Sequence, residues 1–244
     1  INSHLLQRHG ILSHVTVDNH LYEITREDAF KWHDNYPVRF KKVGLNNAIS
    51  YPLFCDKHDT EIFLPIESGT IDFDDYRSQL LFSYRAVCAE IRKKEVNILE
   101  TKENMANIEE MSLAGEAILV GGDKGIKDLN YYKYLLEDEL KTNKGKFTFI
   151  HYSYPVLDIY SSATMSYEIF DSKSERQVEE AIKKKVWDAL FIHIIPQPYS
   201  SEIIIGYHNN HTSRDMANYV KSWNGLGRDE IGYKLTDLFV AHVE

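Results

Sequence analysis

Hydrophobic positions recur every three, four or seven residues over a long stretch in the middle of the chain, between residues 74 and 111. This spacing places them on one face of an α-helix and predicts a single long helix. Two acidic residues, Asp74 and Asp75, come first and favour the N-terminal end of a helix. The apolar positions that define the pattern are Tyr76, Leu80, Tyr84, Val87, Ile91, Ile98 and Met105.

The pattern changes after this helix. Four glycines, at positions 115, 121, 122 and 125, predict a connector before a second helix over residues 128–141. Beyond residue 145, stretches rich in aromatic and β-branched residues, punctuated by prolines and serines, predict a sheet of about four strands. These strands are expected at residues 147–152, 163–170, 187–195 and 202–207. Three more helices are expected at residues 175–185, 213–223 and 230–242.

The first 72 residues carry only short patterns. A helix is expected over residues 5–12, and the turn Asp18-Asn19 predicts a hairpin in which strand 21–24 returns along Val15 and Val17. The fold class is therefore α+β. Three regions are predicted: a small N-terminal unit (1–72), a helical region (73–145), and a β-rich region with flanking helices (146–244).

The amino-acid composition limits how the protein could bind DNA and argues against a disulfide framework or a membrane span. The chain has 37 acidic and 28 basic residues, a formal charge of −9, so DNA could bind only through a local basic patch. Two cysteines, Cys55 and Cys88, do not make a disulfide framework, and no apolar run approaches the roughly 20 residues of a membrane span. These features predict a cytoplasmic protein. The chain starts at Ile1 and its last helical pattern runs almost to residue 244, so we expect both termini to be incomplete.

The strongest chemical motif is Cys55-x-x-His58, followed at once by Asp59. A thiolate and an imidazole at this spacing are typical of one half of a tetrahedral zinc site, which is usually supplied as two close pairs. No second such pair occurs, and packing roles for Cys55 and His58 are an equally weighted alternative. Further imidazoles for the site are offered by His4, His9, His14, His20 and His33.

Several short segments together resemble one family. They are Ser3-His4-Leu5, Gly44-Leu45-Asn46-Asn47-Ala48, and Phe54-Cys55-Asp56-Lys57-His58-Asp59 with Ile62, Phe63, Ile66 and Glu67. This part of the chain resembles uncharacterised bacterial proteins related to HNH, or ββα-metal, endonucleases with a treble-clef zinc unit. The match covers residues 1–67, with Tyr84-Arg85-Ala86 as a weaker extension.

The resemblance assigns roles to these residues. It implies that His4 is the general base, that Asn46 or Asn47 holds the turn, and that Cys55 and His58 are a structural zinc pair. It places Asp59 or His58 near the reaction and implies Mg or Mn as the catalytic ion. The sequence departs from the family in lacking the first cysteine pair and a further histidine on the helix, and in the long insertion between His4 and Asn46.

Two functions follow from these observations. The first is a metal-dependent endonuclease, with phage defence or a toxin system as the setting that the resemblance implies. Its DNA contacts are expected from Arg8, Arg39, Lys41 and Lys42, for which a solvated surface is the alternative. The second is a non-catalytic, zinc-stabilised interaction module or assembly subunit. The 16 tyrosines fit a surface for a protein partner or another copy of the chain.

Two other motifs are weaker. Residues 121–125, Gly-Gly-Asp-Lys-Gly, could cradle a phosphate but lack the Walker spacing, and a flexible turn is the better account. His208 and His211, three residues apart, are a candidate metal-binding pair, and a polar turn on an exposed loop is the alternative that we favour.

Overall fold

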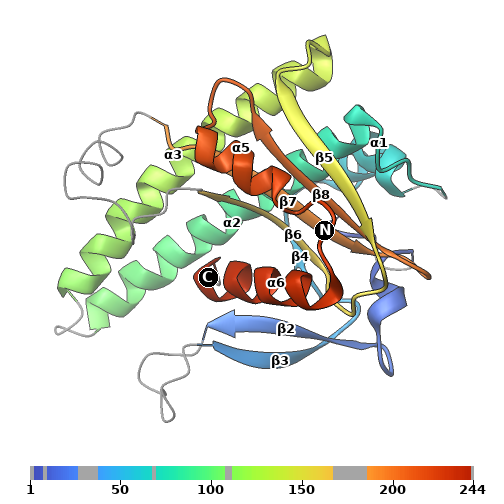
Figure 1. Ribbon diagram of the computed structural model, residues 1–244. Helices are drawn as coiled ribbons and strands as arrows, with labels where there is room; N and C mark the ends of the chain where they lie inside the picture. Colours follow the sequence, from blue (N-terminus) through green and yellow to red (C-terminus); the bar gives the residue numbers. More distant parts are fainter. Residues whose placement is uncertain are drawn as a thin grey trace.

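The computed structural model describes residues 3–7, 10–26, 38–67, 70–107, 112–166 and 186–242. These residues form an α+β fold in which a four-stranded antiparallel sheet lies between two layers of helices (Figure 1). The predicted fold class is confirmed at this level.

The sheet contains β5 (Phe147–Tyr154), β6 (Ser161–Ser166), β7 (Ala189–Pro196) and β8 (Ser201–His208), in the spatial order β5-β8-β7-β6. Every residue of β7 is buried, because helices cover both faces of the sheet. Phe191 and Ile195 belong to the core on one face, whereas Ile192 and Ile194 belong to the core on the other. All four predicted strands are present. Residues 167–170 and the predicted helix at 175–185 lie outside the described ranges.

Helices α2 (Tyr76–Asn107) and α3 (Ser112–Thr142) form a long helical hairpin on one face of the sheet (Figure 1). The helix predicted between residues 74 and 111 is thereby confirmed. The connector predicted at the glycines is wrong, because all four lie inside α3. A Cβ atom at Gly122 would lie 2.9 Å from the Ile98 side chain, and one at Gly115 would lie 2.3 Å from Met105. These glycines let α2 and α3 approach closely, and packing outweighs their low helix propensity.

The opposite face of the sheet is covered by α5 (Arg214–Lys221) and α6 (Arg228–His242), as the sequence predicts. Ser213 caps α5, because its hydroxyl accepts a hydrogen bond from the backbone N–H of Met216 at 3.1 Å. The side chains that these helices bury against the sheet are Met216, Val220, Ile231, Leu235 and Leu238.

The N-terminal part consists of β1 (Ser3–His4), a 3-10 helix η1 (Leu12–Val15), β2 (His20–Arg26), β3 (Val38–Gly44), β4 (Ser50–Tyr51) and α1 (Asp56–Glu67). The predicted turn is present, since Asp18 and Asn19 have positive φ angles of 50° and 59°. Of the predicted pairing, only a single bridge between Val17 and His20 forms, because Val15 lies in η1, and β2 pairs instead along its full length with β3. The helix predicted at residues 5–12 is also wrong over 5–7, which are irregular.

One hydrophobic core joins residues of all three predicted regions. Leu6, Leu12 and Phe63 of the N-terminal part pack in the same cluster as Leu80 of α2 and Phe191 of β7. The N-terminal strands and α1 are therefore held by contacts with the long helices and the sheet. None of the described helices combines the length and the apolarity that a membrane crossing requires.

Candidate functional site

The residues singled out by the HNH resemblance lie on β1, in the turn between β3 and β4, and at and just before α1. Strand β1 pairs antiparallel with β4, with Ser3 opposite Tyr51 and His4 opposite Ser50, and α1 follows β4 directly. The hairpin β2–β3 is inserted between the two strands. The order strand, strand, helix is that of a ββα unit, with a long insertion after the first strand.

His4 and Asn46 are brought together, although 42 positions separate them. The Nε2 atom of His4 lies 3.2 Å from the backbone oxygen of Asn46. A carbonyl oxygen only accepts, so Nε2 carries the proton and Nδ1 is the basic nitrogen of the neutral ring. Asn46 contributes to this contact through its backbone, in a turn closed by the Asn47 N–H bonding to the Gly44 oxygen at 2.8 Å.

Cys55 and His58 lie at the start of α1. The Cys55 sulfur is 3.2 Å from Nδ1 of His58, and the Cys55 carbonyl accepts the first helical hydrogen bond from the Asp59 N–H at 2.9 Å. Both side chains are exposed. Their position on one helical turn is the one expected of a close zinc-binding pair.

The remaining ligands of such a site are not assembled among the described residues. In the described ranges, no group of three or more His, Cys, Asp or Glu side chains is placed to hold a metal ion. A tetrahedral zinc site needs four ligands, so Cys55 and His58 fit half of one. The zinc-finger-like unit predicted from the sequence is therefore not shown among the described residues. His9 and His33 lie outside the described residues.

Asp59 participates in an ion pair with Arg85 of α2. One guanidinium nitrogen of Arg85, Nη2, lies 3.3 Å from Asp59 Oδ1 and 2.7 Å from Glu67 Oε1. The Arg85 side chain is only 1% exposed and stacks on the Phe63 ring at 3.9 Å. Burying a guanidinium requires such partners, because an unpaired buried charge is costly. This contact gives Asp59 a structural role, and its catalytic role stays a prediction.

Other residues of the resembling segments surround this ion pair. The Phe54 ring packs against Phe63 at 5.0 Å and Tyr84 at 6.1 Å between centroids. Much of the motif therefore fixes α1 onto α2. Arg85 was noted from the sequence only as part of a weak match. A lone cation amid the apolar residues Leu80, Leu81, Phe82, Ala86 and Val87 is the pattern that indicates its burial.

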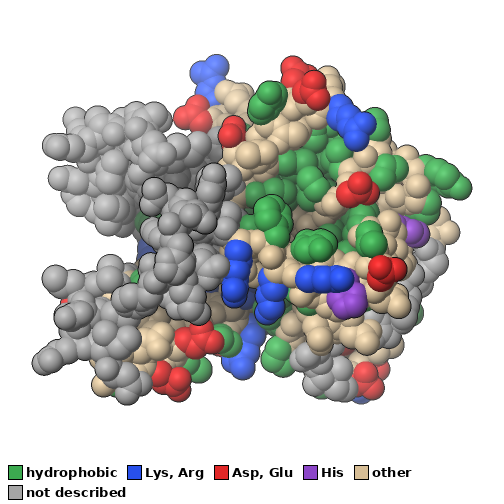
Figure 2. Space-filling view, turned by 90° about the horizontal axis from the view of Figure 1, so that it is seen from below, with side chains coloured by type: hydrophobic (Ala, Val, Ile, Leu, Met, Phe, Trp, Pro, Cys, Tyr) green, Lys and Arg blue, Asp and Glu red, His purple; other side chains and the backbone are tan. Residues whose placement is uncertain are grey.

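The predicted basic patch is exposed on β3. Arg39, Lys41 and Lys42 are all exposed, and Arg8 lies outside the described residues. The β2–β3 hairpin lies at the bottom of the view in Figure 1, and Figure 2 looks at the molecule from below. On that face, Lys and Arg side chains gather beside hydrophobic ones (Figure 2).

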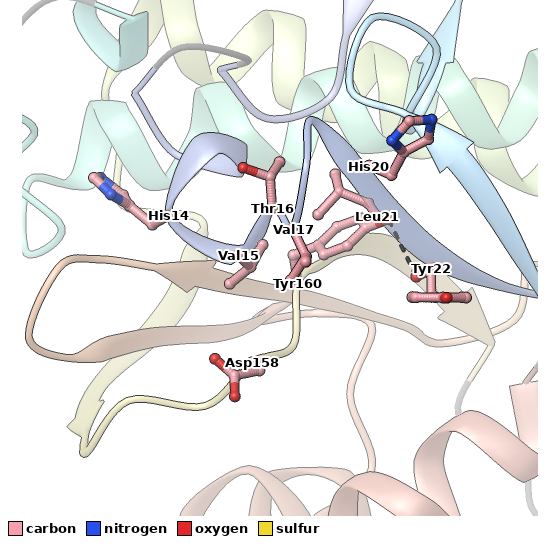
Figure 3. A pocket seen from close by; sticks show the side chains of 9 residues that line it. All are labelled: His14, Val15, Thr16, Val17, His20, Leu21, Tyr22, Asp158 and Tyr160. Carbon is pink, nitrogen blue, oxygen red and sulfur yellow. Dashed lines mark hydrogen bonds between the residues drawn. The ribbon is translucent and has the colours of Figure 1, made fainter.

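A cavity of about 330 Å³ lies beside the same hairpin (Figure 3). Its walls come from the turn before β2, the start of β2 and the segment between β5 and β6, which contributes Asp158 and Tyr160. His14 and His20 lie on opposite sides of it, and their rings do not point toward each other (Figure 3). The two histidines therefore do not form a metal-binding pair here.

The predicted polar turn after β8 is present, with Asn209 and Asn210 exposed. His208 was expected in this loop but is the last residue of β8 and is buried, with 3% of its surface exposed. Its Nδ1 accepts a hydrogen bond from the Asn210 N–H at 3.2 Å, and its ring packs on Phe147 at 4.9 Å. Burial, with smaller contributions from the neighbouring His211 and Lys146, lowers the pKa of His208 to about 4. His211 instead contacts the Tyr131 hydroxyl at 3.1 Å.

A fully buried histidine on β7, His193, was missed from the sequence. Its Nε2 lies 3.1 Å from the Ser83 hydroxyl of α2, and its Nδ1 lies 2.9 Å from the Ser162 hydroxyl of β6. Burial lowers the pKa of His193 to about 3, so the ring is neutral near pH 7. All three side chains are buried, and the arrangement joins helix to sheet rather than facing a substrate. A polar residue inside the apolar run 189–195 is the feature that marks it.

Comparison of the chain with family models, with curated proteins and with solved structures gave no match.

Proposed function

We propose that the ββα unit formed by β1, β4 and α1 is an HNH-like site for metal-dependent hydrolysis of phosphodiester bonds. The observation that carries this proposal is the contact of His4 Nε2 with the Asn46 carbonyl at 3.2 Å. It orients the imidazole and, in the neutral ring, assigns the proton to Nε2. The order of the two strands and the helix, with Cys55 and His58 at the helix start, supports the same proposal.

In the proposed reaction, Nδ1 of His4 takes a proton from a water molecule as its oxygen attacks the phosphorus atom. The bond from phosphorus to the leaving oxygen then breaks, and that oxygen is protonated from solvent. The products are a phosphate monoester and an alcohol. A divalent cation, when bound, supplies stabilisation of the negative charge on the phosphate and the leaving oxygen. Among the described residues, no ligand set for it is assembled, and the proposal assigns it none.

The test is cleavage of labelled single- and double-stranded DNA and RNA with added Mg²⁺ or Mn²⁺. Loss of general-base catalysis typically costs about 100- to 10,000-fold in rate, so His4→Ala should lose activity by that factor. His4→Gln keeps a donor for the Asn46 carbonyl but cannot take the proton, and it should be equally inactive. His14→Ala removes an exposed imidazole outside the unit and should leave the rate unchanged. Active, folded His4→Gln protein would contradict the proposal.

The second candidate is a non-catalytic, zinc-stabilised module that binds a partner protein or assembles with other copies. The observation in its favour is that Cys55 and His58 form a close pair at the start of α1. Elemental mass spectrometry on the full chain distinguishes the cases. Zinc that disappears in Cys55→Ser, in a protein that cleaves no nucleic acid, supports this module. The phage-defence or toxin setting belongs to the nuclease proposal alone.

A further inference from the structure

The β2–β3 hairpin presents aromatic side chains to solvent on one of its two faces. Side chains two positions apart share a face of a strand, and the register places Tyr22 opposite Lys42 and Ile24 opposite Phe40. Tyr22 is 62% exposed and Phe40 is 71% exposed. As diagonal neighbours, they stand about 7 Å apart on an antiparallel pair.

The other face of the hairpin anchors it to the protein. Leu21 is buried and belongs to the main core, and Val43 packs against that core. A carboxylate oxygen of Glu23 accepts the Ile49 N–H at 2.7 Å, and the Tyr160 hydroxyl donates to the Tyr22 carbonyl at 3.4 Å. The exposed aromatic rings therefore project from a backbone that is fixed on its inner side.

The charge of the hairpin is opposite to that of the whole chain. Strands β2 and β3 contain one acidic residue, Glu23, and four basic ones, in a chain of net charge −9. Lys42 shares the face of the two aromatic rings, whereas Arg39 and Lys41, the chain neighbours of Phe40, belong to the opposite face of β3 and are exposed. Protein–protein interfaces are depleted in charged residues at their centres, whereas aromatic rings among cations suit bases and phosphates.

We propose that this face of the β2–β3 hairpin binds single-stranded nucleic acid, with bases stacking on Tyr22 and Phe40 and a phosphate contacting Lys42. Bases in a duplex are already stacked on one another, so exposed rings favour unpaired strands. Strand β3 ends at Gly44, two residues before Asn46, whose carbonyl contacts His4. Delivery of the bound strand to His4 rests on the proposed function, but the binding itself does not.

The experiment is fluorescence anisotropy of the full chain with labelled single-stranded DNA, single-stranded RNA and the matching DNA duplex, in the absence of divalent cations. Base stacking on an aromatic side chain is worth about 1–3 kcal/mol, so Tyr22→Ala and Phe40→Ala should each weaken single-strand binding about 5- to 150-fold. Phe40→Trp should restore binding, whereas Phe40→Leu should not. The matched control is Tyr199→Ala, which removes a ring that is 92% exposed in the turn between β7 and β8.

The phosphate contact of Lys42 has a separate readout. Each phosphate contact contributes about 0.7 to the salt slope of single-strand binding, so Lys42→Gln should lower the slope by about that amount. The DNA and RNA arms identify which strand is preferred. No binding of either strand, or binding that Tyr22→Ala and Phe40→Ala leave unchanged, overturns the inference. So does a change of oligomeric state in Phe40→Ala without oligonucleotide binding, which would identify a protein interface.

The two proposals fail in different ways. Single-strand binding without cleavage, with wild-type affinity in His4→Gln, refutes the nuclease and leaves the hairpin surface standing. Cleavage that needs His4 but is indifferent to Tyr22 and Phe40 refutes the hairpin surface and leaves the nuclease standing.

Discussion

Replacing Arg85 by Ala is predicted to be among the most damaging single changes in the N-terminal part. The substitution removes a guanidinium that is 1% exposed, its contacts with Asp59 and Glu67, and its stacking on Phe63. Breaking a buried ion pair by removing one partner costs about 3–5 kcal/mol. The two carboxylates are 20% and 30% exposed, so water can partly solvate them after the change, and the lower end of that range applies.

We therefore expect Arg85→Ala to lower the free energy of unfolding by about 3 kcal/mol. At about 2–4 °C per kcal/mol for a chain of this size, the Tm should fall by about 6–12 °C. Urea unfolding followed by circular dichroism measures the free energy, and a thermal scan measures the Tm.

The matched control lies on the same helix. Arg92 pairs with Glu95 at 3.1 Å, but its side chain is 40% exposed, and exposed pairs contribute little. Arg92→Ala should change the free energy of unfolding by less than about 0.5 kcal/mol. If Arg85→Ala were no more destabilising than Arg92→Ala, the buried ion pair would not be what holds α1 on α2.

Two further predictions concern stability. The pKa of His193 is lowered to about 3, so below pH 6.5 the unfolded chain binds a proton that the folded chain does not. The free energy of unfolding should therefore fall by up to about 1.4 kcal/mol per pH unit as the pH drops from 6.5 toward 4. In urea titrations, His193→Asn should lose this part of the pH dependence, whereas the control His14→Ala should keep it. In α3, Gly121 has open space around it, so Gly121→Ala should raise the free energy of unfolding by up to about 1 kcal/mol. Gly122→Ala should show no such gain in the same titration, because its Cβ would lie 2.9 Å from Ile98.

The spacing of hydrophobic residues predicted the helices and strands whose packing agrees with the local preference of their residues for helix or strand. The apolar positions of α2 and the aromatic and β-branched runs of β5 to β8 each carry their structure in a short window. The glycines of α3 led the same reasoning to a wrong connector. Two of them are needed because α2 packs closely against α3, through Ile98 and Met105. The partner of β2 was likewise missed, since β3 begins only at Val38.

The candidate site was predicted by resemblance more than by spacing. No local pattern in the sequence predicts that His4 contacts Asn46. Only the resemblance assigns both residues to one unit. The burial of His208 and His193, and the ion pair of Arg85, depend on contacts between residues far apart in the sequence. Such contacts follow from the assembled fold, and a window of neighbouring residues does not contain them.

The long insertion between β1 and β4 determines how late in folding His4 reaches its position. Closing a loop from residue 4 to residue 50 costs about 3 kcal/mol in chain entropy, apart from a constant term. The two residue pairs between these strands are too few to offset that cost. Burial of Leu6, Ile11 and Leu12 in the shared core must supply the difference, and that core needs α2 and the sheet. Strands β1 and β4 should therefore join late, so an isolated fragment ending at residue 67 should leave His4 unplaced.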